Sequence, residues 1–397
     1  MKKYREDFLV LRKKIKGKPI IYLDNACMTL RPRQVVDKVN EYYNEYPACA
    51  GRSQHKLGVL AENAVDESRR TCSKFLTSKK PSEIIFTRNA TEGINLVAHS
   101  LKLDKGDKVL TTDREHNSNL IPWQIHPKAK HGVIPSNEDG TFDLEALDKL
   151  LTKDVKLLSL VHTSNLDGYT IPAKQIIKTA HDNGTLVMLD AAQSAPHREI
   201  NAKKLDVDFL ACSGHKMLGP SGTGILYAKQ ELLESMSPFI VGGETVSDST
   251  YNTQTFEKPP HKFEAGLQNY AGIVGLGAAL KYLKKVGLDK IEAHEKKLRI
   301  HIAKQLEADD KIELVNPKAQ ASGIYSFNIN GIGPHMISLT LDKTSNIMTR
   351  SGQHCVHSWF NAKGIDGSAR ASLYLYNTKE ECDKFVEEVQ KLAKYLG

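Results

Sequence analysis

Two ionisable residues follow apolar runs of the sequence and could together hold an aldehyde cofactor. Asp190 ends the run "GTLVMLD", and Lys216 follows "VDFLAC" within "SGHKMLGPSG". Taken alone, such an Asp is as often a helix N-cap, and a lysine is usually a solvated charge. A lysine directly after a buried strand is partly desolvated, however, which lowers the pKa of its amine and favours Schiff-base chemistry. A carboxylate that keeps a ring nitrogen protonated and an amine that holds an aldehyde are what pyridoxal phosphate needs.

A phosphate group would need hydrogen-bond donors near this pair. The stretch "NATEG" places Thr91 at a strand-to-helix turn, where the N–H groups of the helix point at an anion. Ser213 and His215 could add donors from the other side. The alternative for Thr91 is an ordinary helix-capping residue.

A third group of reactive residues lies in "RSGQHCVHSWF", residues 350–360. Cys355 sits there in a turn-forming stretch with Arg350, His354 and His357 around it. Cationic neighbours favour the thiolate, so the pattern favours a nucleophile. The rival interpretation is a metal site, but these residues are too close together to form one unaided and would need distant ligands such as Cys27 or Cys49. We predict no metal site.

Two glycine-rich stretches are not nucleotide-binding motifs. "GIVGLGAAL", residues 272–280, lies inside a helical pattern and has neither a preceding strand nor a ribose-binding acid. "GPSGTG", residues 219–224, lacks the Gly-Lys-Ser/Thr of a P-loop.

Strands and helices alternate from about residue 20 to residue 230, which predicts a mostly parallel sheet covered on both faces. In such sheets ligands bind beyond the carboxyl ends of the strands. Small, polar and ionisable residues follow five predicted strands in succession, in "RNATEG", "REHNSN", "NLDG", "DAAQSAPH" and "SGHKMLGPSG".

The pattern changes after about residue 260, where two long charged helices precede three strands and a final helix. This predicts a smaller α+β domain. We divide the chain into an N-terminal helical segment that packs with the small domain (1–20), a large cofactor-binding domain (21–258) and a small C-terminal domain with the cysteine loop (259–397).

Composition excludes several classes of protein. Lys and Arg number 55 against 47 Asp and Glu, but this excess is spread over the chain without interleaved aromatic residues, so we predict no nucleic-acid partner. No apolar run approaches the length of a membrane span, and the charged N-terminus does not resemble a signal peptide. The six cysteines are scattered, which favours free thiols. We therefore expect a cytoplasmic protein without a membrane partner.

An ordered set of motifs resembles the class V pyridoxal-phosphate enzymes of fold type I, and among them the SufS-like cysteine desulfurases. The resemblance covers nearly the whole chain and rests on "NATEGIN", "EHNSNLIPWQ", Ser164-Asn165, "DAAQSAPH", "SGHKMLGPSGTGILY", "FEAG", "RSGQHC" and "RASLYLYNT". It implies an α/β fold whose large domain has a mostly parallel mixed sheet between helices.

The resemblance also implies roles for individual residues. Lys216 would hold the cofactor aldehyde and shuttle a proton, and Cys355 would attack the sulfur of the substrate. The other implied contacts are Asp190 with the ring nitrogen; Gln193 with the ring hydroxyl; His116 stacked on the ring face; Ala90, Thr91, Ser213 and His215 with the phosphate end; and Arg370, Asn165, Arg350 and Asn25 with the substrate.

The implied activity is removal of sulfur from L-cysteine, which gives L-alanine and a persulfide on Cys355 for iron–sulfur clusters or other sulfur transfer. A homodimer and a sulfur-acceptor protein or scaffold are the implied partners. One alternative is another class V reaction, of the selenocysteine lyase or epimerase type, which needs Lys216 but no thiol. A second alternative is a metal- or cluster-binding scaffold that uses Cys27, Cys49 and Cys355.

The chain departs from the family pattern at several positions. Gln353 stands where the family has the first histidine of "RxGHHC", and Asn117 replaces the second histidine of "EHH". Leu267 replaces a threonine that reaches the phosphate of the partner subunit. Cys27 and Cys49 are also unexpected, and they are either packing thiols or a second sulfur-relay or metal-binding pair.

Overall fold

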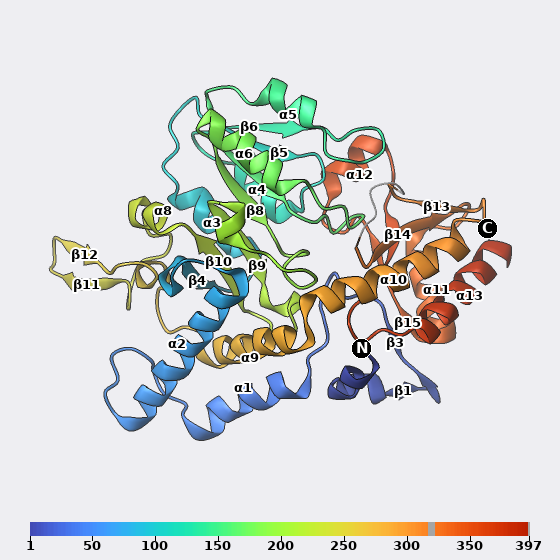
Figure 1. Cartoon of the computed structure of the whole chain (residues 1–397), viewed down its shortest axis with the longest axis horizontal. Helices are drawn as coiled ribbons and strands as arrows, with labels where there is room; N and C mark the ends of the chain where they lie inside the picture. The colour runs from blue at the N-terminus through green and yellow to red at the C-terminus, as the bar shows by residue number, and fades with distance from the viewer. Residues whose placement is uncertain (317–321, 396–397) are drawn as a thin grey trace.

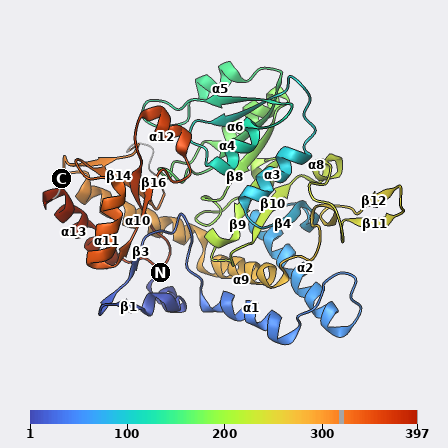
Figure 2. The same cartoon turned by 180° about the vertical axis from the view of Figure 1, so that it is seen from behind.

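A computed structural model describes residues 1–316 and 322–395 of the chain. Within these residues the chain forms a seven-stranded sheet between helices and a separate four-stranded antiparallel sheet (Figure 1). Both views place the two chain termini on the side of the smaller sheet (Figures 1 and 2). The predicted fold class is therefore confirmed, while Leu396, the last residue of the predicted final helix, lies outside the described residues.

The large sheet is mostly parallel, as predicted. The pairs β5–β6, β5–β7, β7–β8 and β8–β9 are parallel, and only β10 runs against its neighbours among the described strands. All the parallel strands, β4 included, therefore end at one edge of the sheet. In spatial order the strands are β4 (Ile84–Thr87), β10 (Gly224–Ala228), β9 (Phe209–Ser213), β8 (Leu186–Asp190), β7 (Val155–Val161), β5 (Lys108–Thr112) and β6 (Lys130–Ile134).

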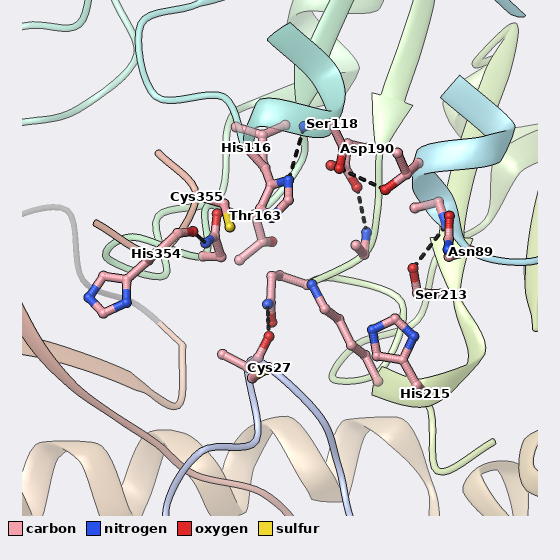
Figure 3. Close-up of a pocket in the computed structure, with 18 of the residues that line it drawn as sticks. Cys27, Asn89, His116, Ser118, Thr163, Asp190, Ser213, His215, His354 and Cys355 are labelled. Carbon is pink, nitrogen blue, oxygen red and sulfur yellow. Dashed lines mark hydrogen bonds between the residues drawn. The ribbon is translucent and has the colours of Figure 1, made fainter. Parts of the chain in front are cut away.

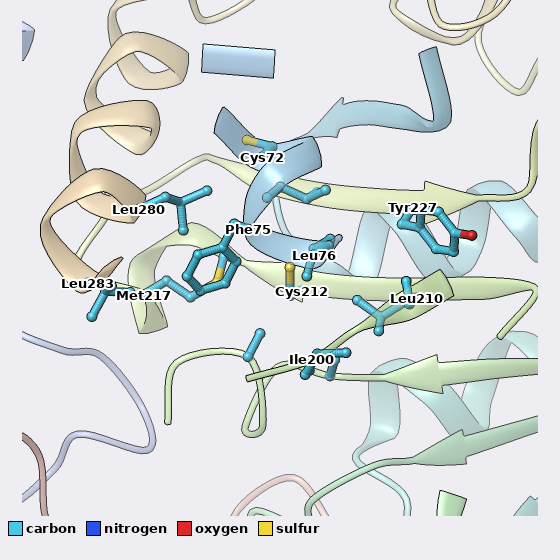
Figure 4. Packing of buried hydrophobic residues seen from close by; sticks show 14 of the residues in the cluster. Cys72, Phe75, Leu76, Ile200, Leu210, Cys212, Met217, Tyr227, Leu280 and Leu283 are labelled. Atoms are coloured by element: carbon cyan, nitrogen blue, oxygen red, sulfur yellow. The ribbon is translucent and has the colours of Figure 1, made fainter. Parts of the chain in front are cut away.

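Successive side chains of these strands enter two different cores, because they point to opposite faces of the sheet. Leu210 and Cys212 pack with helices α2 (Lys56–Leu76) and α9 (Tyr270–Val286), as Figure 4 shows. Phe209 and Ala211 instead pack with helix α3 (Ala90–Ser100). Burial on both faces explains why these strands are continuous apolar runs.

A third core lies around the smaller sheet, whose strands are β13 (Ile312–Leu314), β14 (Ile324–Ile329), β17 (Ser368–Ser372) and β16 (Arg350–Gly352). Helices α10 (Leu288–Leu306), α11 (Pro334–Ser345) and α13 (Lys379–Tyr395) contribute buried side chains to it.

The N-terminal part of the chain also contacts this region. Strand β3 (Ile21–Tyr22) pairs with β15 (Ile347–Met348), and Arg5 forms an ion pair with Glu381 at 2.6 Å. The domain boundaries at 20 and 258 stay a prediction.

Several elements differ from the sequence predictions or were not predicted. One of the three strands predicted after residue 260, "SNIMTR" at 345–350, contains the short strand β15 and ends where β16 begins, and these two strands belong to different sheets. Helix α2 was not assigned, although its buried residues Ala61, Val65, Cys72 and Leu76 recur at helical spacing. Strand β6 and the hairpin of β11 (Val246–Ser249) and β12 (Gln254–Phe256) were not assigned either.

A buried ion pair ties α2 to the segment that precedes α9. Arg69 donates from both terminal nitrogens to the two carboxylate oxygens of Glu264, each at 2.8 Å. Glu264 also accepts from the backbone N–H of Phe86 at 2.7 Å. A charge left alone at such a site is costly. We therefore expect Glu264→Ala to lower the free energy of unfolding by about 3–5 kcal/mol, measured by urea denaturation.

The half-exposed Glu67 supplies a matched control, because it pairs with Arg70 and Lys281 at the surface. Glu67→Ala should change the free energy of unfolding by less than about 1 kcal/mol. Equal effects of the two substitutions would contradict the importance of the buried pair.

Candidate active site

The carboxyl ends of the parallel strands meet at a cavity of about 220 Å³ (Figure 3). Twelve of the thirteen predicted site residues line this cavity. They are Ala90, Thr91, His116, Asn165, Asp190, Gln193, Ser213, His215, Lys216, Arg350, Cys355 and Arg370. The exception is Asn25. Its buried amide donates to Ser372 O at 2.6 Å and is also bonded to Tyr376 and Asn377, so the structure places Asn25 in a structural network beside the cavity.

Asp190 and Lys216 come from neighbouring strands. Asp190 ends β8 and accepts from the N–H of Ala192 at 2.9 Å, and Lys216 lies in the turn directly after β9. Burial lowers the pKa of Lys216, while Asp190 opposes that shift. Burial raises the pKa of Asp190, while Ala192 N–H and Lys216 oppose it. Burial thus disfavours the charged form of each group, and each group partly offsets that effect on the other.

The amino end of α3 faces the same cavity. Ala90 N donates to Ser213 Oγ at 2.9 Å, and Thr91 Oγ1 lies 2.7 Å from Ser118 Oγ. His215 is half-buried, and burial together with Lys216 lowers its pKa to about 4. Hydroxyl groups and helix N–H groups around one point are suited to a phosphate.

His116 is held as a neutral imidazole. It caps helix α4 (Asn117–Gln124), and its Nδ1 accepts from Ser118 N at 3.1 Å. Burial, followed by the charges of Lys216 and Arg370, lowers its pKa to about 3. A neutral ring fixed in this way can lie against an aromatic cofactor without adding charge.

Unpaired polar atoms cluster in this cavity. Arg370 Nε, Asn165 Oδ1 and Gln193 Oε1 are buried and have no hydrogen-bond partner in the part of the chain that the structure describes. Arg370 is only 3 % exposed; it donates to Asn165 O at 2.8 Å and lies 3.7 Å from Asp24. Because buried polar groups are nearly always paired, these atoms indicate groups shaped to receive a ligand.

The loop of Cys355 is held in an unusual backbone conformation. It connects β16 to α12 (His357–Lys363), and His354 and Cys355 have positive φ angles of 49° and 60°. Each costs of the order of 1 kcal/mol or more for a residue other than glycine. Two hydrogen bonds hold the conformation, from Asn165 Nδ2 to His354 O and from Asn117 N to Cys355 O, both at 2.7 Å. The exposed thiol is therefore presented to the cavity by a docked loop.

Sequence reasoning missed several of the lining residues. Asn89, Ser118 and Thr163 line the cavity without having been assigned a role. His354, expected beside Cys355, and Cys27, one of the two unexpected thiols, line it as well. The sequence could have indicated Ser118, because it lies two residues after His116 at the start of a helix. Asn117, which departs from the family pattern, forms a side-chain hydrogen bond with His357 at 2.9 Å. Cys49 is not among the lining residues.

No group of three or more His, Cys, Asp or Glu side chains suited to a metal ion occurs within residues 1–316 and 322–395. The same described ranges contain no helix with the length and apolar character that crossing a bilayer requires.

The fold and this cavity define a pyridoxal-phosphate enzyme of fold type I. The chain belongs to the family whose model is described as "Aminotransferase class-V", which matches residues 21–385. The cavity fits the cofactor of that family. It offers Lys216 for the aldehyde, Asp190 for the ring nitrogen, the start of α3 for the phosphate, and unpaired buried atoms for further contacts.

Within the family, the chain is similar to cysteine desulfurases. A protein of Synechocystis sp. named "Probable cysteine desulfurase" is 40% identical over 99% of this chain and 96% of its own length. The apo structure of a cysteine desulfurase from Thermococcus onnurineus NA1 has a TM-score of 0.94 and 36% identity, and covers 99% of this chain and 98% of its own. A cysteine desulfurase from Escherichia coli, solved with an S-sulfonic acid, has a TM-score of 0.92 and 31% identity over 100% of this chain and 98% of its own.

Arg370→Lys should weaken binding of a substrate carboxylate. A guanidinium forms two parallel hydrogen bonds with a carboxylate, and a lysine cannot reproduce them. We expect KM for L-cysteine to rise about 10-fold or more, with a smaller change in kcat, measured by steady-state alanine formation. Arg198→Lys, which changes a cation paired with Glu292 outside the cavity, is the control. An unchanged KM for Arg370→Lys would place the carboxylate elsewhere.

Buried neutral histidines should make the protein sensitive to acid. Burial lowers the pKa of His162 from 6.5 to about 4, and His162 bonds to Ser194 at 2.9 Å. As the pH falls, the unfolded chain therefore binds a proton on His162 before the folded protein does. The folded state keeps its full stability above pH 6.5 and loses stability as the pH falls from 6.5 towards 4. Each such histidine changes the free energy of unfolding by about 1.4 kcal/mol per pH unit in that window.

The measurement is the melting temperature between pH 7 and pH 5, which should fall. His162→Gln should make this fall shallower, whereas a change at the exposed His261, His261→Gln, should not. The same slope in His162→Gln as in the unsubstituted protein would refute the assignment.

Proposed function

We propose that this protein is a cysteine desulfurase that converts L-cysteine to L-alanine and leaves the sulfur as a persulfide on Cys355. The observation that carries the proposal is the exposed thiol of Cys355 at the same cavity as Lys216, Asp190 and Arg370. A lyase or epimerase of the same family would need the lysine but not the thiol. The similarity to named cysteine desulfurases supports the same conclusion.

Lys216 and Asp190 serve the cofactor. Pyridoxal phosphate, when bound, supplies an electron sink conjugated to the amino group of the substrate. The Nζ of Lys216 would hold the aldehyde group of the cofactor, and the same amine would move the Cα proton of the substrate. Its lowered pKa suits it to this proton transfer. The Asp190 carboxylate holds the proton of the ring nitrogen.

Arg370 and Asn165 orient the substrate. The guanidinium would bind the carboxylate of L-cysteine. The Asn165 side chain lines the same cavity and holds the cysteine loop through His354 O, while its Oδ1 is buried without a partner among the described residues. One asparagine thus contacts the loop that carries Cys355 and the space where the substrate binds. This couples the position of the thiol to the position of its target.

Cys355 receives the sulfur. Its thiolate attacks the substrate sulfur, the bond between that sulfur and Cβ breaks, and Cβ takes a proton to become the methyl group of alanine. The balance is one enzyme thiol and one L-cysteine in, and one enzyme persulfide and one L-alanine out. No external oxidant is needed.

The finer proposals concern partners and location. A homodimer is supported by exposed apolar side chains such as Leu267, which is 73% exposed, and Tyr43. The six cysteines are free thiols, which supports a reducing, cytoplasmic compartment. We further propose that the persulfide passes to an acceptor protein or scaffold, as in iron–sulfur cluster assembly.

Incubation with L-cysteine, pyridoxal phosphate and a thiol reductant tests the function. We expect L-alanine and sulfide in equal amounts, because the reductant releases the persulfide sulfur after each turnover. L-selenocysteine in a parallel assay distinguishes a selenocysteine lyase, which would act on it and leave L-cysteine nearly untouched. Product other than alanine from L-cysteine would refute the proposal.

A further inference from the structure

Cys27 is a second thiol in the active-site cavity that the proposed mechanism does not use. It lies in the turn that follows β3, where its backbone N–H donates to Asp24 O at 3.2 Å. Arg350 Nη1 donates to Cys27 Sγ at 3.4 Å. The guanidinium therefore lies in direct contact with the sulfur of Cys27.

The two thiols share the same electrostatic surroundings. Figure 3 labels Cys27, on the N-terminal segment, and Cys355 among the residues that line the cavity. Lys216, Arg350 and Arg370 line the same cavity as both thiols, and Arg350 contacts Cys27 directly. Arg370 Nε, almost fully buried and without a hydrogen-bond partner among the described residues, indicates that the cavity lined by both thiols receives a polar ligand.

The segments that carry the two thiols differ in how they are held. Cys355 lies on a loop with two successive positive φ angles, docked by hydrogen bonds from Asn165 and Asn117. Cys27 lies in a turn in which its backbone N–H bonds to Asp24 O and its sulfur accepts from Arg350. Both thiols are thus presented to the cavity by segments that hydrogen bonds hold in place.

We infer that Cys27 is a second sulfur acceptor, which takes the outer sulfur of the Cys355 persulfide within the same cavity. This inference rests on the proposed function. The Cys27 thiolate attacks the outer sulfur, the sulfur–sulfur bond of the persulfide breaks, and Cys355 leaves as a thiolate. One persulfide and one thiolate enter the step and one of each leaves, so no oxidant or reductant is consumed.

The consequence is a second turnover without any external acceptor. Once Cys27 holds the sulfur, Cys355 is free to attack another L-cysteine. Without reductant, the burst of alanine should reach about two per chain, and Cys27→Ser should lower it about 2-fold. Cys49→Ser is the matched control, because it removes a free thiol that does not line the cavity, and its burst should equal that of the unsubstituted protein.

Peptide mass mapping locates the sulfur directly. After the burst, the protein is alkylated and digested, and a retained extra sulfur marks each persulfide. We expect it on Cys27 and Cys355 in the unsubstituted protein, on Cys355 in Cys27→Ser, and on neither in Cys355→Ala.

Three results would overturn the relay. The first is an extra sulfur on Cys355 alone with a burst of one alanine. The second is an extra sulfur on Cys27 in Cys355→Ala, which would mean direct attack on the substrate. The third is a Cys27–Cys355 disulfide with release of sulfide, which would mean attack on the inner sulfur. Failure of the proposed function looks different, since neither alanine nor any persulfide would form.

Discussion

Cys355→Ser should abolish alanine formation from L-cysteine, with a fall in kcat of the order of 1,000-fold or more. A serine hydroxyl keeps the shape of the loop but is not a nucleophile towards sulfur. The loop itself should survive, because its hydrogen bonds use the backbone oxygens of His354 and Cys355 rather than the thiol. The measurement is alanine formed in the presence of reductant.

Two comparisons make this result specific. Cys49→Ser, which changes an exposed cysteine outside the cavity, should keep full activity. The Cys355→Ser variant should still bind pyridoxal phosphate, so its cofactor content should match that of the unsubstituted protein. Alanine formation at the full rate by Cys355→Ser would contradict the persulfide mechanism and favour a lyase that needs no thiol.

The strand ends were the part of the site that the sequence could predict. Because parallel strands end at one edge of a sheet, the segments after β4, β5, β7, β8 and β9 had to meet there once the apolar runs were recognised as strands. Asp190 and Lys216 illustrate the rule, since their strands are adjacent and in register. Local patterns were sufficient for these residues.

Contacts between distant segments could not be predicted in this way. The position of Cys27 at the cavity depends on the turn after β3 and its neighbour Arg350, more than 300 residues away in sequence. Asn25, two residues earlier, points instead into a network with Tyr376 and Asn377. No periodicity in "YLDNACMT" distinguishes the residue that faces the cavity from the one that does not.

The departures from the family pattern gain a physical explanation only from the structure. Asn117 donates its backbone N–H to Cys355 O, and its side chain bonds to His357. Gln353 donates to Asn361 at 3.2 Å within the same loop region. Asn117 therefore holds the cysteine loop against α4, and Gln353 connects the same loop to α12. For Leu267 the structure offers no such partner within the described chain.

Lys216→Ala should remove both the covalent attachment of the cofactor and the activity. Reduction with borohydride fixes a bond between a lysine nitrogen and an aldehyde carbon, so the intact mass of the unsubstituted protein should rise by one cofactor after treatment. The variant should show no such increase, because no other lysine lines the cavity formed by the described residues. Alanine formation should fall about 1,000-fold or more, as expected for loss of the group that moves the proton.

Lys216→Arg separates attachment from charge. The guanidinium keeps a cation near Asp190 but cannot form the bond to the aldehyde. If Lys216 served only to balance the buried Asp190, the Arg variant would retain activity and the Ala variant would not. We expect both to be inactive and neither to gain mass, whereas Lys102→Ala, which changes an exposed lysine, should behave as the unsubstituted protein does. A cofactor attached after borohydride treatment of either Lys216 variant would show that another amine holds it.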